Sequence, residues 1–276
     1  MITGTHLPAA AAGGLAVATS GSRVRTAPAA APLVDMELLV KAAQIDPRRP
    51  DRALTPGAKE SVLLVERALM ARGLLTAGQL DGHFGTGTIA AYAAYQRSLG
   101  YSGPDATGLP GRASLRLLGE RRFTVTRMLT TGARVTLRGA RVNARTRSML
   151  LEAERLFGRP LGITQGSYTP GAGRSAGAHG GGGVLRLSVG GMSATAWTAV
   201  LRSLRTVGFA AWLRTPAQGN WPYHIQAIAL ADTDQSTDAR NQAGDYYLGL
   251  NGLANRGRDD GPAGTPKQTW EEYRRA

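Results

Sequence analysis

Residues 81–88 read DGHFGTGT and are followed by a helical pattern that ends at Gly100. An aspartate and several glycines permit a tight turn at this point, and Thr86 or Thr88 can cap the helix that follows. Phe84 is the large apolar residue of the turn and is expected to plug a small core. The stretch therefore predicts a helical bundle that closes around Phe84.

Three short helices are expected around this turn, over residues 61–73, 86–99 and 112–118. Helical spacing supports the first of them, because Val62, Val65 and Leu69 fall on one side of it. Gly73 suits its C-terminal end, since glycine adopts the left-handed conformation there without strain. We expect residues 55–119 to form an all-α three-helix bundle.

The same turn resembles that of the peptidoglycan-binding module found on many wall hydrolases. The hallmark of that module is an Asp-Gly-x-Phe-Gly-x-x-Thr turn, then a Gln and a Gly in and after the next helix. The residues that match are Asp81, Gly82, Phe84, Gly85, Thr88, Gln96 and Gly100. The resemblance covers residues 55–119 and implies a bundle that holds the glycan or the stem peptide in a shallow groove beside the turn.

Four residues are candidates to line such a groove, namely Asp81, Tyr92, Tyr95 and Gln96. Aromatic faces and an amide group suit sugars and peptides. For the two tyrosines an alternative is equally open. They also fall at helical spacing with Ile89 and can simply belong to the core.

Strands and helices mix in the second half of the chain. Asn143 can cap a helix that runs to Phe157, and residues 193–207 form an amphipathic pattern that carries Trp197 and Leu204. Strands are expected over residues 161–168, 183–189, 209–214 and 224–230. This order predicts a second domain, residues 143–252, of the α+β class with a mostly antiparallel sheet.

The remaining segments divide the chain further. Residues 1–34 are expected to be a signal peptide or a disordered leader, because residues 7–19 are alanine-rich and apolar but follow no basic residue. We expect a linker over residues 35–54, a β-hairpin linker over residues 120–142 and a charged tail over residues 253–276. An export segment would make the protein secreted or wall-located. No stretch is long and apolar enough to predict a membrane span.

The composition excludes several classes of site. The chain has no cysteine, which removes disulfides, thiolate zinc sites and cysteine nucleophiles. Lys and Arg number 33 against 19 acidic residues, and nearly all of the excess is arginine, as is typical of a GC-rich, actinobacterial type of genome. The net charge of +14 is then either codon bias on a solvated surface or a sign of anionic wall polymers as partners. Nucleic acid is not an expected partner, because no dense basic run is interleaved with aromatic residues.

A glycine-rich loop, residues 175–183, leads into the second expected strand. Together with residues 163–168 and 223–228, it resembles the zinc D-alanyl-D-alanine peptidases and the hedgehog signalling domain that shares their fold. The resemblance covers residues 142–231. In that family a Ser-x-x-x-His segment supplies one zinc ligand, an Asp seven residues later supplies the second, and the last His of a His-x-His strand supplies the third.

The three ligand positions hold His179, Arg186 and Gln226 in this chain. A catalytic zinc needs three protein ligands and an open position for water. Arg186 cannot lose its proton and an amide is a weak ligand, so His179 would be a residual metal ligand only and zinc is not expected. His224 matches the family's non-ligand histidine, which stabilises the reacting carbonyl, and is expected to be vestigial. The general-base carboxylate is also missing near Asn220, so no catalytic residue is expected.

These observations favour a binding protein over an enzyme. We expect a peptidoglycan-binding pseudoenzyme without a cofactor, whose peptidase-like domain holds a stem peptide through Arg186 and Gln226. A guanidinium is a good bidentate receptor for the carboxylate that ends D-alanyl-D-alanine. The alternative is a zinc-dependent carboxypeptidase or endopeptidase that acts on D-alanyl-D-alanine in peptidoglycan.

Overall fold

Four strands form the main sheet of the computed structural model, which describes Met1, residues 30–169 and residues 176–276. The strands are β5 Ile163–Gln165, β6 Val184–Ser188, β7 Phe209–Arg214 and β8 His224–Ala229. They follow the order β5-β6-β8-β7, and each neighbouring pair is antiparallel. The expected antiparallel sheet is confirmed, and the fold is of the mixed α+β class.

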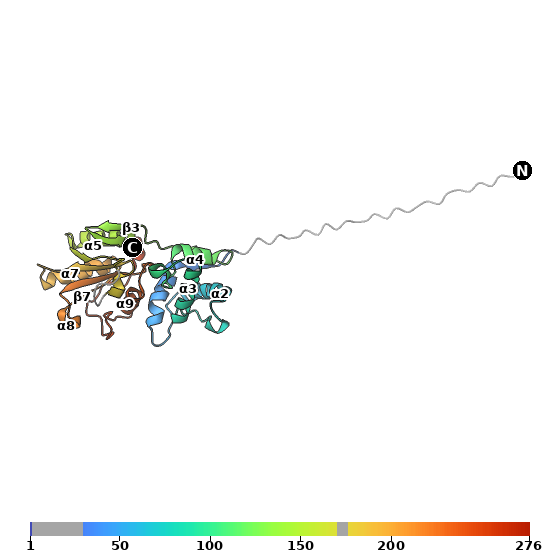
Figure 1. The fold of residues 1–276 in the computed structure, drawn as a ribbon, viewed down its shortest axis with the longest axis horizontal. Coiled ribbons are helices and arrows are strands. Elements are labelled where there is room, and N and C mark those ends of the chain that lie inside the picture. The colour runs from blue at the N-terminus through green and yellow to red at the C-terminus, as the bar shows by residue number, and fades with distance from the viewer. Residues whose placement is uncertain (2–29, 170–175) are drawn as a thin grey trace. The chain divides into compact units, whose positions relative to one another are not determined.

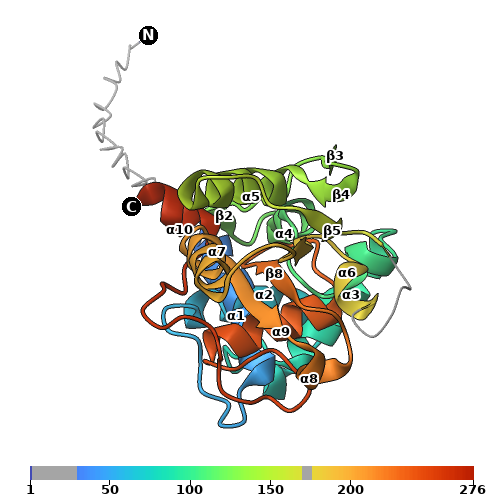
Figure 2. The same ribbon diagram turned by 90° about the vertical axis from the view of Figure 1, so that its left-hand side faces the viewer.

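Helices cover both faces of this sheet (Figures 1 and 2). The helices of this half are α5 Ala144–Phe157, α6 Ala176–His179, α7 Ala194–Thr206, α8 Pro216–Gly219 and α9 Thr237–Tyr247. α5 and α7 pack on the face that carries Leu185 and Phe209. α6 and α9 pack on the opposite face, against Val184 and Ile228. Because side chains alternate along a strand, Arg186 lies on the α9 face, next to Val184.

The helical part, residues 36–119, contains α1 Met36–Ile45, α2 Lys59–Met70, α3 Thr86–Ser98 and α4 Arg112–Gly119. The last three helices occur where the sequence predicts them, and Phe84 is fully buried in their common core. α1 lies in residues 35–54, which were expected to be a linker, yet its apolar side chains belong to the same core. Asp35 begins this helix by accepting a hydrogen bond from the Leu38 backbone N–H (3.1 Å). The helical core is therefore shared by all four helices.

Two small strand pairs and three short 3-10 helices complete the described elements of this region. The strands are β1 Leu33–Asp35, β2 Thr124–Thr126, β3 Arg134–Leu137 and β4 Ala140–Asn143. The 3-10 helices cover Asp46–Arg48, Ala77–Gln79 and Gly103–Ala106. β1 pairs in parallel with β2, which ties the start of α1 to the chain after α4. β3 and β4 form an antiparallel hairpin, as expected for residues 120–142.

α9 lies between the sheet and the helical part, and α1 packs against it (Figure 1). The Gln44 side chain donates a hydrogen bond to Gln235 Oε1 (2.7 Å), and both residues are fully buried. Arg48 donates two hydrogen bonds to Asp245, at 3.0 and 2.9 Å. Gly244 permits this close approach, because a Cβ there would lie 2.0 Å from the Gln44 carbonyl oxygen.

The segments expected to be linkers and tail are part of the folded unit. Ala31–Ala276 form one compact unit, so the two domains expected on either side of residues 120–142 pack together. In the tail, Thr269 caps α10 (Trp270–Arg275), and Arg275 forms a salt bridge with Glu37 of α1 (2.9 Å).

Residues 2–29 of the leader expected over residues 1–34 lie outside the described residues, whereas Leu33 and Val34 belong to β1 and Val34 is buried in the helical core. Over residues 30–169 and 176–276, no helix combines the length and the apolar character needed to cross a bilayer.

Gly244→Ala should destabilise the fold although alanine favours helices. The added Cβ would meet the Gln44 backbone oxygen, and overpacking of this kind costs about 1–3 kcal/mol. Urea unfolding should therefore show a lower midpoint than that of the unchanged protein. Gly78→Ala is the matched control, because nothing lies within 4 Å of its added Cβ. Equal midpoints for the two variants would contradict the packing of α1 on α9.

Candidate functional site

Two buried carboxylates hold the DGHFGTGT turn in place. Glu66 accepts hydrogen bonds from the Gly82 backbone N–H and from the Thr88 hydroxyl, both at 3.0 Å. Asp46 accepts one from the backbone N–H of Phe84 (2.9 Å). Sequence analysis missed both carboxylates, because neither belongs to the turn motif. The turn is thus a rigid part of the fold.

Tyr92 and Tyr95 lie inside the helical part, and Gln96 is buried at the edge of a small pocket next to Ser114. Tyr92 and Tyr95 are 0% and 1% exposed, and their phenol oxygens lie 3.1 and 3.3 Å from oxygen atoms of Ser114 on α4. The Gln96 amide is buried and makes two 2.8 Å hydrogen bonds to the backbone of residues 108–109. Of the two roles expected for Tyr92 and Tyr95, their burial and their partners favour the core, whereas a binding role for Gln96 stays a prediction.

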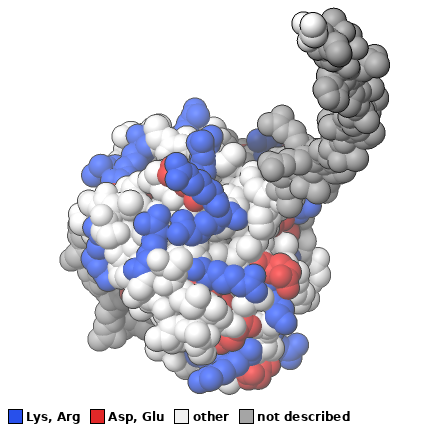
Figure 3. All heavy atoms as spheres, turned by 90° about the vertical axis from the view of Figure 1, so that its right-hand side faces the viewer, with Lys and Arg blue, Asp and Glu red and all other residues white. Residues whose placement is uncertain are grey.

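Asp81 remains at the surface, where its carboxylate accepts a hydrogen bond from the His83 backbone N–H (2.9 Å). Basic side chains are scattered over the face that the helical part presents (Figure 3). The exposed cations of residues 55–122 are Lys59, Arg67, Arg72, Arg97, Arg112, Arg116, Arg121 and Arg122. The exposed acids of the same stretch are Glu60, Asp81, Asp105 and Glu120. This surface is therefore positively charged.

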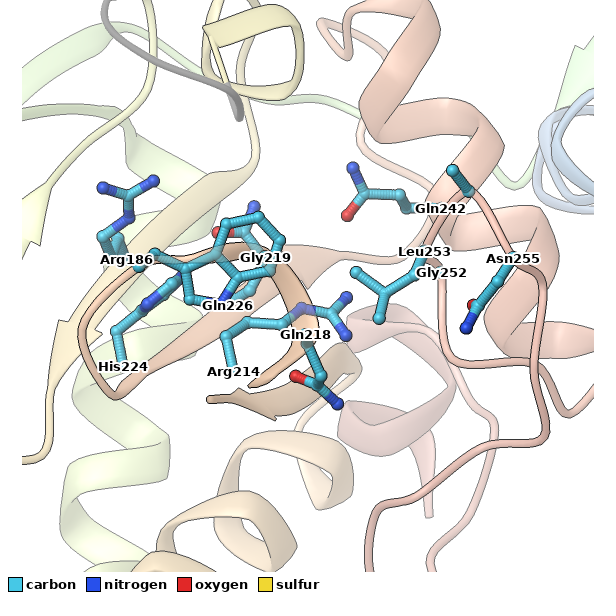
Figure 4. A pocket seen from close by; sticks show the side chains of 12 residues that line it. Arg186, Arg214, Gln218, Gly219, His224, Gln226, Gln242, Gly252, Leu253 and Asn255 are labelled. Carbon is cyan, nitrogen blue, oxygen red and sulfur yellow. The ribbon is translucent and has the colours of Figure 1, made fainter. Parts of the chain in front are cut away.

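A pocket of about 450 Å³ opens at the polar end of the α9 face of the sheet (Figure 4). It is lined by Arg186, Arg214, Gln218, Gly219, Trp221, His224, Gln226, Gln242 and residues 252–255. Arg186 lies opposite Gln226 across β6 and β8, and Arg214 lies opposite His224 across β7 and β8. The described lining contains no carboxylate, so the pocket is cationic.

The structure brings together the residues that the sequence singles out in this half. His179 is fully buried at the end of α6, with Nδ1 2.8 Å from the Gly166 carbonyl oxygen and Nε2 3.4 Å from Gln226 Oε1. Gln226 in turn is paired with Arg186 on the neighbouring strand. His224 lies two residues from Gln226 and therefore on the same face.

These residues do not fit a three-ligand zinc site. Burial lowers the pKa of both His179 and His224, and the charge of Arg186 lowers both further, which favours neutral imidazoles. A neutral imidazole can bind a metal, but a guanidinium next to it repels a divalent cation. Within the described part of the chain, no group of three His, Cys, Asp or Glu is placed to hold a metal ion.

Arg214 and Trp221 are pocket residues that sequence analysis missed. Arg214 is 3% exposed, its guanidinium lies 4.8 Å above the Trp212 ring, and its Nη1 has no acceptor among the described residues. The Trp221 indole N–H is likewise buried without an acceptor in that part of the chain. Burial lowers the pKa of Arg214 to about 10, which leaves it charged at neutral pH. The sequence feature that could have pointed to Arg214 is its place at the end of an otherwise apolar strand.

The pocket thus offers fixed cations, indole and amide groups, which suit the binding of an anion. Comparison with protein-family models, with curated proteins and with solved structures gives no match for this chain. Function is therefore inferred from the pocket and from the turn.

Glu66→Gln should change the way in which stability depends on pH. Burial raises the pKa of Glu66 to about 7 in the folded state, so the folded protein holds this proton more tightly than the unfolded chain does. The resulting stabilisation is greatest at low pH and is lost as the pH rises through about 7. From pH 5 to pH 8 the free energy of unfolding of the unchanged protein should fall, relative to the variant, by on the order of 2 kcal/mol.

Chemical denaturation at a series of pH values measures this difference. Glu60→Gln, at an exposed position of the same helix, is the control and should follow the unchanged protein. Parallel curves for the unchanged protein and Glu66→Gln would contradict a proton held by this buried carboxyl group.

Proposed function

We propose that this chain is a secreted, peptidoglycan-binding protein of the cell wall and a catalytically silent relative of the zinc D-alanyl-D-alanine peptidases. In this proposal the pocket holds a stem peptide, and residues 55–119 act as a three-helix module that contacts the wall. The observation that carries the proposal is the cationic pocket. In it, Arg186 lies opposite Gln226 on a face shared with His224.

A cation at this place favours an anionic ligand over a metal ion. A guanidinium keeps its charge at physiological pH and presents a planar fork that matches a carboxylate. D-alanyl-D-alanine ends in such a carboxylate. The side-chain amides of Gln218, Gln242 and Asn255 add partners for the N–H and C=O groups of a peptide.

The helical part supports the other half of the proposal. Glu66 and Asp46 hold its turn rigidly, and Asp81 stays at the surface. The surplus of exposed cations suits anionic polymers that accompany peptidoglycan. With Tyr92 and Tyr95 in the core, a wall contact here would use the turn and the basic surface in place of an aromatic groove.

Co-sedimentation with purified peptidoglycan sacculi tests the proposal. The unchanged protein should be retained by the sacculi. Arg186→Ala should bind a soluble muramyl pentapeptide about tenfold or more weakly in isothermal titration, because a hydrogen bond to a charged group is lost. Arg147→Ala, at an exposed position of α5 outside the pocket and outside the basic surface of the helical part, is the matched control. An unchanged protein that stays in the supernatant, or equal pentapeptide binding by both variants, would count against the proposal.

Arg186→Asp combined with Gln226→His should create a zinc site. His179 Nε2 already lies 3.4 Å from the Gln226 side chain, and Arg186 lies opposite Gln226, so three ligands would converge. Metal analysis of this variant, purified without a histidine tag, should find about one zinc per chain. Stoichiometric zinc in the unchanged protein, lost in His179→Ala, would instead favour the zinc peptidase.

A further inference from the structure

We propose that Arg214, together with Trp221, is the receptor for a terminal carboxylate in this pocket. The assignment takes its peptide ligand from the proposed function, but its location comes from two buried donors. Arg214 is buried, whereas Arg186, the residue that the sequence suggests for this role, is only half-buried. The carboxylate would therefore lie deeper in the pocket than the sequence predicts.

No salt bridge to the guanidinium of Arg214 forms among the described residues, although Asp259 and Asp260 act on its charge from nearby. Both acids are engaged elsewhere. Asp259 forms a salt bridge with Arg205 (2.8 Å), and Asp260 accepts a hydrogen bond from Gln218 (2.8 Å). Buried charges are as a rule paired, because desolvation of a lone charge is costly. Arg214 is thus placed for an anion that comes from outside the chain.

Arg214 and Trp221 both line this pocket, and each has a buried donor without an acceptor in the described chain. The Arg214 guanidinium lies over the Trp212 ring, and His224 stands opposite Arg214 on β8. The Trp221 ring meets His224 edge-on, with 6.1 Å between ring centroids, so its indole N–H belongs to the same end of the pocket. Unpaired donors from two separate segments in one pocket are the kind of groups that an oxyanion requires.

The wall near Arg214 is a braced loop, which includes Leu253 and Asn255 (Figure 4). The Asn251 side chain accepts a hydrogen bond from the Leu253 backbone N–H (3.0 Å), and the Asn251 N–H donates to the Gly257 carbonyl (2.8 Å). Leu253 is therefore a fixed apolar surface in the same pocket. Such a wall suits a ligand whose carboxylate is carried by a residue with a small apolar side chain.

Isothermal titration with diacetyl-L-lysyl-D-alanyl-D-alanine, and with the same peptide as a C-terminal amide, tests the assignment. The unchanged protein should bind the free acid about tenfold or more tightly than the amide, because the amide removes a charge-assisted hydrogen bond. In Arg214→Met this preference should disappear, whereas Arg147→Met, at an exposed position of α5 outside the pocket, should keep it. Arg214→Met should also unfold at the same or a higher temperature, since it removes a buried charge that has no ion-pair partner.

Arg214→Lys provides a second variant if Arg214→Met does not fold. It keeps the charge but loses the planar fork, so the preference for the free acid should fall. A folded Arg214 variant with the full preference would overturn the assignment. An unchanged protein that binds both peptides equally, or neither of them, would overturn it as well.

The sacculus experiment separates this assignment from the proposed function. If sacculi do not retain the unchanged protein but its preference for the free acid depends on Arg214, the proposed function is wrong and the assignment of Arg214 holds. If sacculi retain the unchanged protein but Arg214→Met binds both peptides as the unchanged protein does, the assignment of Arg214 is wrong and the proposed function holds.

Discussion

Cross-strand pairing between β6, β8 and β7 is the constraint on which the pocket depends. The register sets Arg186 against Gln226 and Arg214 against His224 on one face. The opposite face of the same strands is wholly apolar and is buried under α5 and α7. A slip of one residue would turn each polar side chain into that core, so burial of the apolar face fixes the register and with it the pocket.

The α9 face of the sheet is divided along its length. α9 packs on the apolar end, where Val184 and Ile228 lie, and the polar end beyond it becomes the pocket. α9 also contributes Gln242 to the pocket lining while Gly244 packs against α1. The helical part therefore supports one wall of the pocket without contributing a residue to it, since none of the lining residues comes from α1 to α4. This explains why the two halves share one unit.

Local patterns in the sequence predict most of the elements. Alternation and apolar runs locate β7 and β8. The resemblance over residues 142–231 groups His179, Arg186 and Gln226, and in the structure His179 lies 3.4 Å from Gln226, which is opposite Arg186 in the sheet. Helical periodicity also locates α2, α3 and α4. The sequence does not predict α1, because the prolines just after it suggest a break in structure. Its burial also depends on contacts with α9, which lies far along the chain.

Long-range partners account for the errors in the candidate site. Periodicity shows that Tyr92 and Tyr95 share a face of a helix, but only the position of α4 shows that this face is covered. Glu66 is separated by 16 residues from the turn residue that it binds, so no local motif contains it. Arg214 is one of 33 Lys and Arg residues, and its place at the end of an apolar strand is a weak local sign that it is buried.

Charge decides between a metal site and an anion site in this pocket. The Gly166 carbonyl oxygen can only accept a hydrogen bond, so Nδ1 of His179 donates it, and Nε2 is the ring nitrogen that lies next to Gln226. A dication about 5 Å from a guanidinium is nevertheless repelled by several kcal/mol at an effective dielectric constant of about 20. Arg186 and Arg214 both repel a divalent cation in this way, and both attract an anion. A single exchange of Gln226 for histidine would add an imidazole but leave this repulsion, so the same charge disfavours a metal ion and favours an anion.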